Sequence, residues 1–252
     1  LGFIGAPIAS LISYHLMLVL GLLQCYIAPR DAWSGLSYKA FDARGLKICW
    51  TLGLASTGAV ISEWWSWEIA GLMTSWLGTT PLAAQSVLLV TSSITFQLPY
   101  AISVAAAVRV GNLLGANQPR IAKISSQMAG IVALGAGLLN SAVLVIFRNQ
   151  WGFLFSSEPE VVRLVSNVLP LVAAFQIADS ISGTCGGVLR GVGQQHLSAY
   201  INIISYYAAG LPLAFLLIKT GSGLEGVWWG LTLGLYLGAT GAAIVVQRIV
   251  SA

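Results

Sequence analysis

The chain has 252 residues, of which 57% are hydrophobic and only 8% are charged, and its formal net charge is +4. A soluble domain carries about 25% charged residues, so this composition predicts an integral membrane protein and excludes a soluble domain. The basic residues are dispersed along the chain, without the cluster of Lys and Arg that would follow phosphates, so we expect no nucleic-acid partner.

Seven apolar segments are long enough to cross a bilayer, which takes about 20 residues. They span 2–27, 46–77, 82–110, 124–147, 161–189, 197–218 and 224–249. The sequence therefore predicts an all-α, polytopic membrane protein with about seven transmembrane helices. Proline within a helix frees backbone carbonyls, so we expect kinks or local unwinding in three of them, at Pro99, Pro170 and Pro212.

The longest polar stretch covers residues 28–46 and separates the first segment from the other six. We interpret residues 1–29 as the last helix of a preceding bundle, residues 30–45 as a linker, and residues 46–252 as a six-helix lobe. The chain begins with Leu and opens directly on an apolar run. We therefore expect it to be a fragment of a longer protein.

Basic residues are distributed unequally between the two ends of the predicted helices. Only three of the 12 lie on one side, and the other side holds Arg30, Lys39, Arg44, Lys47, Arg109, Arg120, Lys123, Arg190 and Arg248. Positively charged loops stay in the cytoplasm, which predicts cytoplasmic loops at 28–46, 111–123 and 190–196 and a cytoplasmic C-terminus. The same rule, together with snorkelling, explains Arg109 and Arg190 without a substrate.

Three carboxylates lie within otherwise apolar segments: Glu63, Glu68 and Asp179. A charge at the bilayer centre costs about 2.5–3.5 kcal/mol on insertion scales, so an intramembrane acid points to an ion or substrate path. Glu63 and Glu68 are five residues apart, which places them about 140° from each other around a helix. We therefore expect the two side chains to face different surroundings.

Other polar and aromatic side chains are candidates for contact with a substrate. Trp64 follows Glu63, and an aromatic face beside a carboxylate suits a planar organic cation. Lipid contact or packing is the alternative for Trp64. Gln85 is the only sizeable polar side chain in its stretch and is a further candidate. Asn202 and Tyr206 are candidates as well, with interhelical hydrogen bonding as their alternative. The cysteines and histidines are scattered without metal or disulfide spacing, so we expect no metal and no cofactor.

Several stretches resemble the C-terminal half of the multidrug and toxin extrusion (MATE) family. They are SEWWSWE (62–68), LAAQSVLL (82–89), SVAAAVRVGNLLGA (103–116), GGVLRGVGQQ (186–195) and YYAAGLPLAF (206–215), in the expected order. The run SEWW…E is most similar to the eukaryotic branch. The resemblance implies a twelve-helix fold in two six-helix lobes, of which this chain would supply the sixth helix and the whole C-terminal lobe, with the first five helices missing.

The resemblance also implies a function, namely a cation-coupled antiporter rather than an enzyme. Such a protein exports organic cations, drugs or toxins, with the proton as the expected coupling ion and Na⁺ as the alternative. We expect Glu63 and Asp179 to form the proton-coupling pair, because two carboxylates in a low-dielectric site cannot both ionise at low cost. The expected substrate-binding residues are Glu68, Trp64, Gln85, Asn202 and Tyr206. The full-length protein is expected to be a monomer in the plasma membrane or in a vacuolar or other organellar membrane.

Two other functions stay open at this point. A lipid or lipid-linked flippase would have similar lobes. A wide basic cavity would favour this function, whereas the basic residues of this sequence lie at the ends of the predicted helices. A membrane aspartyl hydrolase would use Glu63 and Asp179, but it would require paired acids in short defined motifs. The sequence contains no such motif, and GxSxG, HExxH and the P-loop are absent as well.

Overall fold

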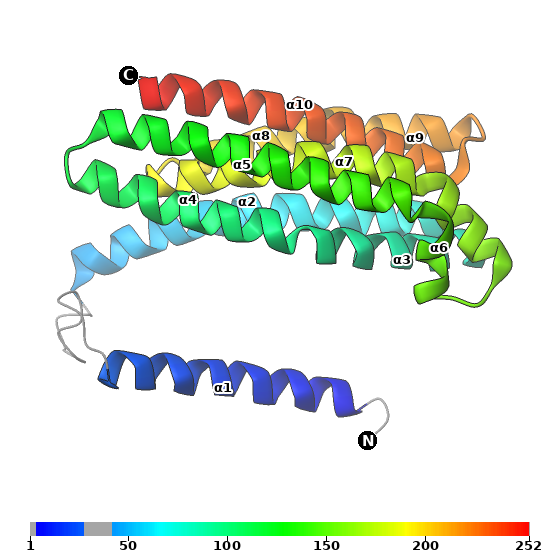
Figure 1. Ribbon diagram of the computed structural model, residues 1–252, viewed down its shortest axis with the longest axis horizontal. Helices are drawn as coiled ribbons and strands as arrows, with labels where there is room; N and C mark the ends of the chain where they lie inside the picture. Colours follow the sequence, from blue (N-terminus) through cyan, green and yellow to red (C-terminus); the bar gives the residue numbers. More distant parts are fainter. Residues whose placement is uncertain (1–3, 28–41, 252) are drawn as a thin grey trace. The chain divides into compact units, whose positions relative to one another are not determined.

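A computed structural model describes residues 4–27 and 42–251, and these residues form helices and turns without a strand (Figure 1). The chain divides into two units, Leu1–Trp50 and Thr51–Ala252. The first unit contains α1 (Gly5–Ile27) and the beginning of α2 (Ala43–Ser75). Most of the predicted linker lies outside the described residues, and the predicted domain boundaries stay predictions.

The second unit is a six-helix lobe that begins with the rest of α2. It continues with α3 (Thr79–Thr95), α4 (Gln97–Gly115), α5 (Pro119–Ile146), α6 (Arg148–Trp151), η3 (Gly152–Leu154), α7 (Pro159–Gly191), α8 (Gln195–Asn202), η4 (Ile203–Gly210), α9 (Leu211–Lys219) and α10 (Gly223–Ser251). α3 with α4 form one span, and α8 with η4 and α9 form another. Within the described residues, seven helical segments are long and apolar enough to cross a membrane, as predicted.

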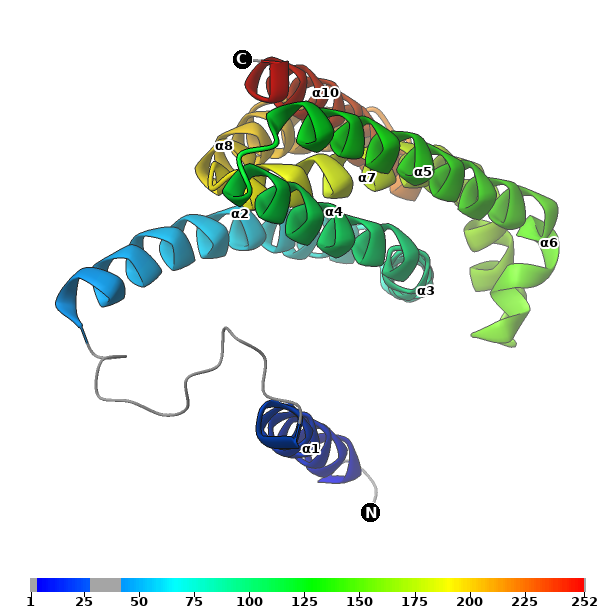
Figure 2. The same ribbon diagram turned by 60° about the vertical axis from the view of Figure 1, so that its left-hand side comes forward.

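Helix α7 lies at the centre of the lobe and packs against α3, α4, α5 and α10 (Figure 2). Apolar residues recur around its circumference, so that Val165, Leu169, Val172 and Phe175 are fully buried. The Phe175 ring lies 5.8 Å from the ring of Trp228 on α10. A helix that is apolar on all sides belongs in the interior of a bundle. α7 is therefore the element against which the other helices are positioned.

Glycine allows two of these helix pairs to approach closely. A side chain at Gly187 of α7 would collide with the backbone carbonyl of Ser103 on α4. On α10, a side chain at Gly230 would meet the carbonyl oxygen of Gly210 at 2.5 Å. Small residues at a four-residue spacing let helix backbones come together in a membrane. The contacts of α4 with α7 and of η4 with α10 therefore depend on the absence of a side chain.

The three prolines differ in their effect on the helices. Pro99 follows the interruption between α3 and α4. Proline has no backbone N–H, so it cannot donate to the carbonyl of Thr95 one turn earlier. This carbonyl instead accepts a hydrogen bond of 2.8 Å from Asn140 Nδ2 of α5. Pro212 follows the π-helical η4 at the beginning of α9. Helix α7, in contrast, continues without interruption through Pro170. The structure therefore shows no local unwinding at Pro170, and a kink at this residue stays a prediction.

Candidate functional site

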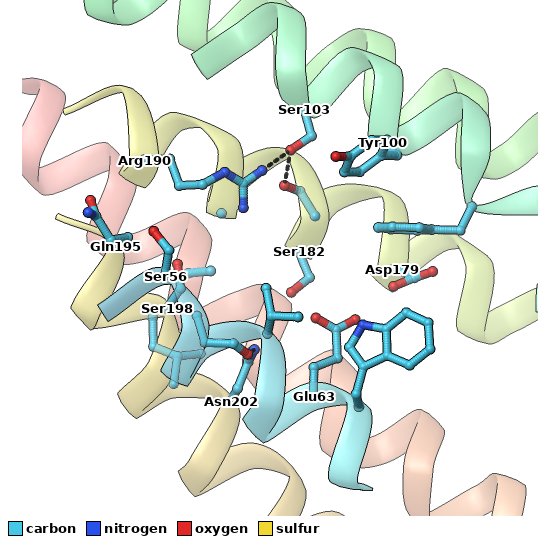
Figure 3. A pocket seen from close by; sticks show the side chains of 18 of the residues that line it. Ser56, Glu63, Tyr100, Ser103, Asp179, Ser182, Arg190, Gln195, Ser198 and Asn202 are labelled. Carbon is cyan, nitrogen blue, oxygen red and sulfur yellow. Dashed lines mark hydrogen bonds between the residues drawn. The ribbon is translucent and has the colours of Figure 1, made fainter. Parts of the chain in front are cut away.

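The six-helix lobe encloses a cavity of about 430 Å³ between α2, the start of α4, the second half of α7, and α8 with η4 (Figure 3). Pockets for drug-sized ligands have volumes of about 300–1,000 Å³. Acidic, basic, hydroxyl and aromatic side chains all line this cavity. Its size and its mixed lining suit a small organic molecule with polar groups.

Glu63 of α2 and Asp179 of α7 direct their carboxylates into the same part of the cavity (Figure 3). Asp179 is 7% exposed, and the two groups are close enough for their charges to interact. Within the described part of the chain, neither carboxylate has a hydrogen-bond or ion-pair partner. The two acids therefore lie in one site, as predicted. Their role in proton coupling stays a prediction.

The sequence of α2 explains why Glu63 faces the cavity and Glu68 does not. Ser62, Ser66 and Ala70 recur every four residues and form the buried stripe of the helix. Small residues in this stripe allow α2 to lie close to the lobe, and Glu63 flanks the stripe on the cavity side. Glu68 lies on an exposed face of the helix and is not among the cavity residues. The structure thus separates Glu68 from the predicted substrate-binding group.

Trp64 stands at the rim of the cavity. Its side chain is 65% exposed, yet it contributes to the lining beside Glu63. An indole face in this place can contact the flat surface of a bound cation.

The wall beside α2 is formed by α8 and η4. Asn202 donates a hydrogen bond of 3.3 Å from Nδ2 to the carbonyl of Ala59, which joins this wall to α2. Tyr206 lies in η4, is only 2% exposed, and is close enough to Glu63 and Asp179 to sense both charges. Segments of π-helix are frequently found at functional sites. Asn202 and Tyr206 thus line the cavity, and their contact with a substrate stays a prediction.

Gln85 is the second residue of the predicted group that lies away from the cavity. It is 1% exposed, and its Oε1 accepts a hydrogen bond of 2.8 Å from Nε1 of Trp228, which is fully buried. Gln85 does not line the cavity. The structure therefore corrects its placement, because the amide satisfies a buried indole between α3 and α10.

Arg190 also reaches the cavity, which the sequence did not predict. Its side chain is exposed, and its guanidinium contributes to the cavity lining and donates a hydrogen bond of 2.8 Å to Ser103 Oγ (Figure 3). The Ser103 hydroxyl donates in turn to the carbonyl of Gly183, also at 2.8 Å. Arg190 and Glu63 therefore lie in one cavity, close enough for their charges to interact.

Sequence reasoning missed Arg190, Ser103, Gln195 and Ser198 as cavity residues. It searched for intramembrane acids and aromatic residues, and these four are neither. One signal was available, because glycines surround the arginine in GGVLRG. Gly187 and Gly191 let α7 approach α4 closely, and this approach brings Arg190 to Ser103.

Comparisons with known proteins agree on one family. The model of the MatE family matches residues 55–216. Multidrug and toxin extrusion protein 1 of Homo sapiens is 32% identical over 236 residues, covering 92% of this chain and 41% of the human protein. Protein DETOXIFICATION 16 of Arabidopsis thaliana is 35% identical over 252 residues, covering 97% of this chain and 51% of the plant protein.

A solved structure gives the same result for the fold. The crystal structure of the eukaryotic MATE transporter AtDTX14 matches with a TM-score of 0.90 and 31% sequence identity. The match covers 100% of this chain and 58% of that protein. This chain therefore spans about half the length of the relatives it matches.

Proposed function

Because this chain belongs to the multidrug and toxin extrusion family of transporters, we propose that it forms half of an antiporter that exchanges protons for organic cations across a membrane. The observation that carries the proposal is the cavity itself. It has the volume of a drug site, and it contains two carboxylates without a partner in the described part of the chain. Matches to proteins named for multidrug and toxin extrusion favour this function over a lipid flippase or a hydrolase.

The proposed mechanism is a competition for the carboxylates of Glu63 and Asp179. An ionised pair in a site of low dielectric is costly, so the pair requires either protons or a cation. A proton bound on one side of the membrane displaces the organic cation, and a cation bound on the other side displaces the proton. Exchange is driven by the proton gradient, which supplies about 1.4 kcal/mol for each tenfold difference in proton concentration.

The other cavity residues act on the organic cation in this proposal. Trp64 offers an aromatic face next to Glu63, where cation–π attraction adds to the attraction between charges. Tyr206 places its ring and hydroxyl beside both acids, and Asn202 holds α8 against α2. Glu68 and Gln85 have no part in this binding, because neither lines the cavity.

The test is transport by the product of the complete reading frame that contains this sequence, reconstituted in proteoliposomes. A fluorescent organic cation is added, and its uptake is followed after a jump in external pH. Uptake should follow the direction and the size of the pH gradient. A Na⁺ gradient at constant pH is the matched comparison, and uptake driven by Na⁺ alone would replace the proton as coupling ion. Uptake that responds to neither gradient would contradict the proposal.

The 252-residue chain by itself serves as the second arm of this experiment. Its relatives are about twice as long. We propose that export requires the complete antiporter, because a cavity that opens alternately to two sides needs a second lobe to move against. The chain alone should therefore bind organic cations without moving them. Robust pH-driven uptake by the chain alone would show that one lobe is sufficient.

A further inference from the structure

The end of the cavity opposite the two acids has a positive charge. Arg190 presents its guanidinium to the cavity, and its one protein partner among the described residues is the neutral hydroxyl of Ser103, at 2.8 Å (Figure 3). No carboxylate of the described residues lies within ion-pair distance of this guanidinium. A guanidinium has five N–H donors, and its planar fork matches a carboxylate or phosphate group. Arg190 is an exposed residue that lines the cavity, and the donors that Ser103 does not engage are available to a bound molecule.

Two further polar groups at this end are buried without a partner. Gln195 is 6% exposed, and its Nε2 donates to the carbonyl of Leu52 at 3.2 Å, which leaves Oε1 as an unpartnered acceptor. The Ser198 hydroxyl is likewise without a partner. Buried polar groups are nearly always hydrogen-bonded in native proteins. Both residues belong to the cavity lining, so their unpartnered atoms add to the polar character of this end.

The position of Arg190 is fixed by the packing of the helices rather than by a flexible loop. The carbonyl of Gly183 accepts from Ser103 Oγ at 2.8 Å, and α4 is held against α7 where glycine removes the side chain, at Gly187 and Gly191. Ser103 is therefore a fixed anchor for the guanidinium. A preorganised donor binds an anion more tightly, because less freedom is lost on binding.

The spacing of the two charged ends suits a drug-sized molecule. Asp179 and Arg190 both belong to α7, and their backbone positions lie about 16 Å apart along the helix axis. Both side chains extend into one cavity of about 430 Å³, which shortens the gap between the charged groups. A planar cation next to the acids can thus extend a second group to the arginine.

We propose that this cavity is bipolar, with an anion-binding end formed by Arg190, Ser103 and Ser198, and that it prefers organic cations that also carry a carboxylate or another small anionic group. The cationic part of the ligand lies beside Glu63 and Asp179, and the anionic part accepts hydrogen bonds from Arg190 and Ser198. Gln195 Oε1 accepts an N–H or O–H of the same ligand. This inference rests on the proposed function for the cationic part, and it adds the chemistry of the second end.

The experiment measures equilibrium binding rather than transport. The product of the complete reading frame is placed in lipid nanodiscs, and the anisotropy of two dyes is titrated. One dye is a rhodamine with a free carboxylate, and the other is its methyl ester, which keeps the same cationic ring system. The wild-type protein should bind the carboxylate dye about tenfold more tightly than the ester, because a hydrogen bond to a charged group is stronger than one to a neutral group.

Three variants locate this preference. Arg190→Gln should weaken binding of the carboxylate dye about tenfold and change binding of the ester less than twofold. Arg190→Lys keeps the charge without the planar fork and should retain part of the preference. Arg109→Gln is the matched control, because Arg109 is also near the end of its helix but bonds to Ser125 Oγ and does not line the cavity. It should change neither affinity.

Equal affinity of the wild-type protein for the two dyes would overturn the inference, even if Arg190→Gln did not fold. If a folded Arg190→Gln variant lost affinity for both dyes to the same extent, the inference would also be overturned. The arginine would then affect the shape of the cavity rather than bind the carboxylate. The outcome is separable from that of the proposed function. A protein that discriminates the dyes but shows no pH-driven uptake would retain the bipolar site and lose the antiport mechanism.

Discussion

Glu63 of α2 and Asp179 of α7 turn their carboxylates toward one another across a single cavity (Figure 3). Neither group has a hydrogen bond or an ion pair with any other described residue. A pair of acids in such a place cannot hold two negative charges at low cost. We therefore expect the two acids to share a bound proton or cation.

We expect Asp179→Asn to reduce pH-driven uptake at least tenfold in proteoliposomes containing the product of the complete reading frame. The amide imitates a carboxyl group that never releases its proton, so the pH gradient loses its effect. Glu63→Gln should behave in the same way, and the double variant should be no worse than either single one, because both residues act in one step. All variants should insert and fold normally, since a neutral amide costs less in a membrane than a charge.

Glu68→Gln is the control for this pair. It removes the same charge from the same helix, but Glu68 lies outside the cavity and is exposed. It should therefore change uptake less than twofold at every pH. If Glu68→Gln abolished the pH dependence while the Glu63 and Asp179 variants kept it, the assignment of the coupling site to this cavity would be wrong.

The acids and the spans follow directly from the sequence, because both depend on composition along the chain. Seven apolar runs predict seven spans. An acid within such a run can be recognised from the sequence without knowing which face of the helix it lies on. The faces of the helices are harder to predict. The helix α2 has an exposed Trp64 next to the cavity residue Glu63, so polarity does not mark the inward side.

Gln85 and Arg190 show what depends on tertiary packing. Hydropathy alone does not tell whether an amide faces a cavity or a buried indole, and Gln85 contacts Trp228, which lies far away in the sequence. A guanidinium near a helix end can extend to the membrane surface or turn inward. Arg190 turns inward because α4 approaches closely enough to offer Ser103. These contacts depend on how the helices pack against one another, and the spacing of residues along one helix does not predict that packing.

We expect Gly187→Ala to lower stability by about 1–3 kcal/mol, because the new methyl group collides with the rigid backbone of Ser103 and pushes α4 from α7. Gly135→Ala on α5 is the matched control. Its side chain would meet no atom within 4 Å, so the change should be neutral or slightly stabilising. The melting temperature of each variant is measured from the fraction of protein that stays monodisperse after heating in detergent. Equal melting temperatures for the two variants would show that α4 and α7 have more freedom than their contact indicates.

We expect Trp228→Phe to destabilise the protein by about 1–3 kcal/mol, because the buried amide of Gln85 loses its one hydrogen-bond donor. Gln85→Met should also lower the melting temperature, and the double variant should cost less than the sum of the single ones. Affinity for organic cations should change less than twofold in Gln85→Met, since Gln85 lies away from the cavity. If Gln85→Met lost much of its affinity for organic cations while its stability stayed unchanged, Gln85 would instead be a substrate-binding residue.

We expect the loop between α4 and α5 to face the cytoplasm and the loop between α9 and α10 to face the opposite side. The distribution of Lys and Arg motivates this orientation, because positively charged loops are retained in the cytoplasm. Asn117 and Ser222 are exposed in these two loops and are suitable for single cysteines. They are introduced into the 252-residue chain, in a variant whose three cysteines, Cys25, Cys49 and Cys185, are replaced by Ala. A membrane-impermeant maleimide applied to intact cells that carry the protein in their plasma membrane should label Ser222→Cys and spare Asn117→Cys until the membrane is permeabilised. The reverse pattern would place the C-terminus on the non-cytoplasmic side and contradict the predicted orientation.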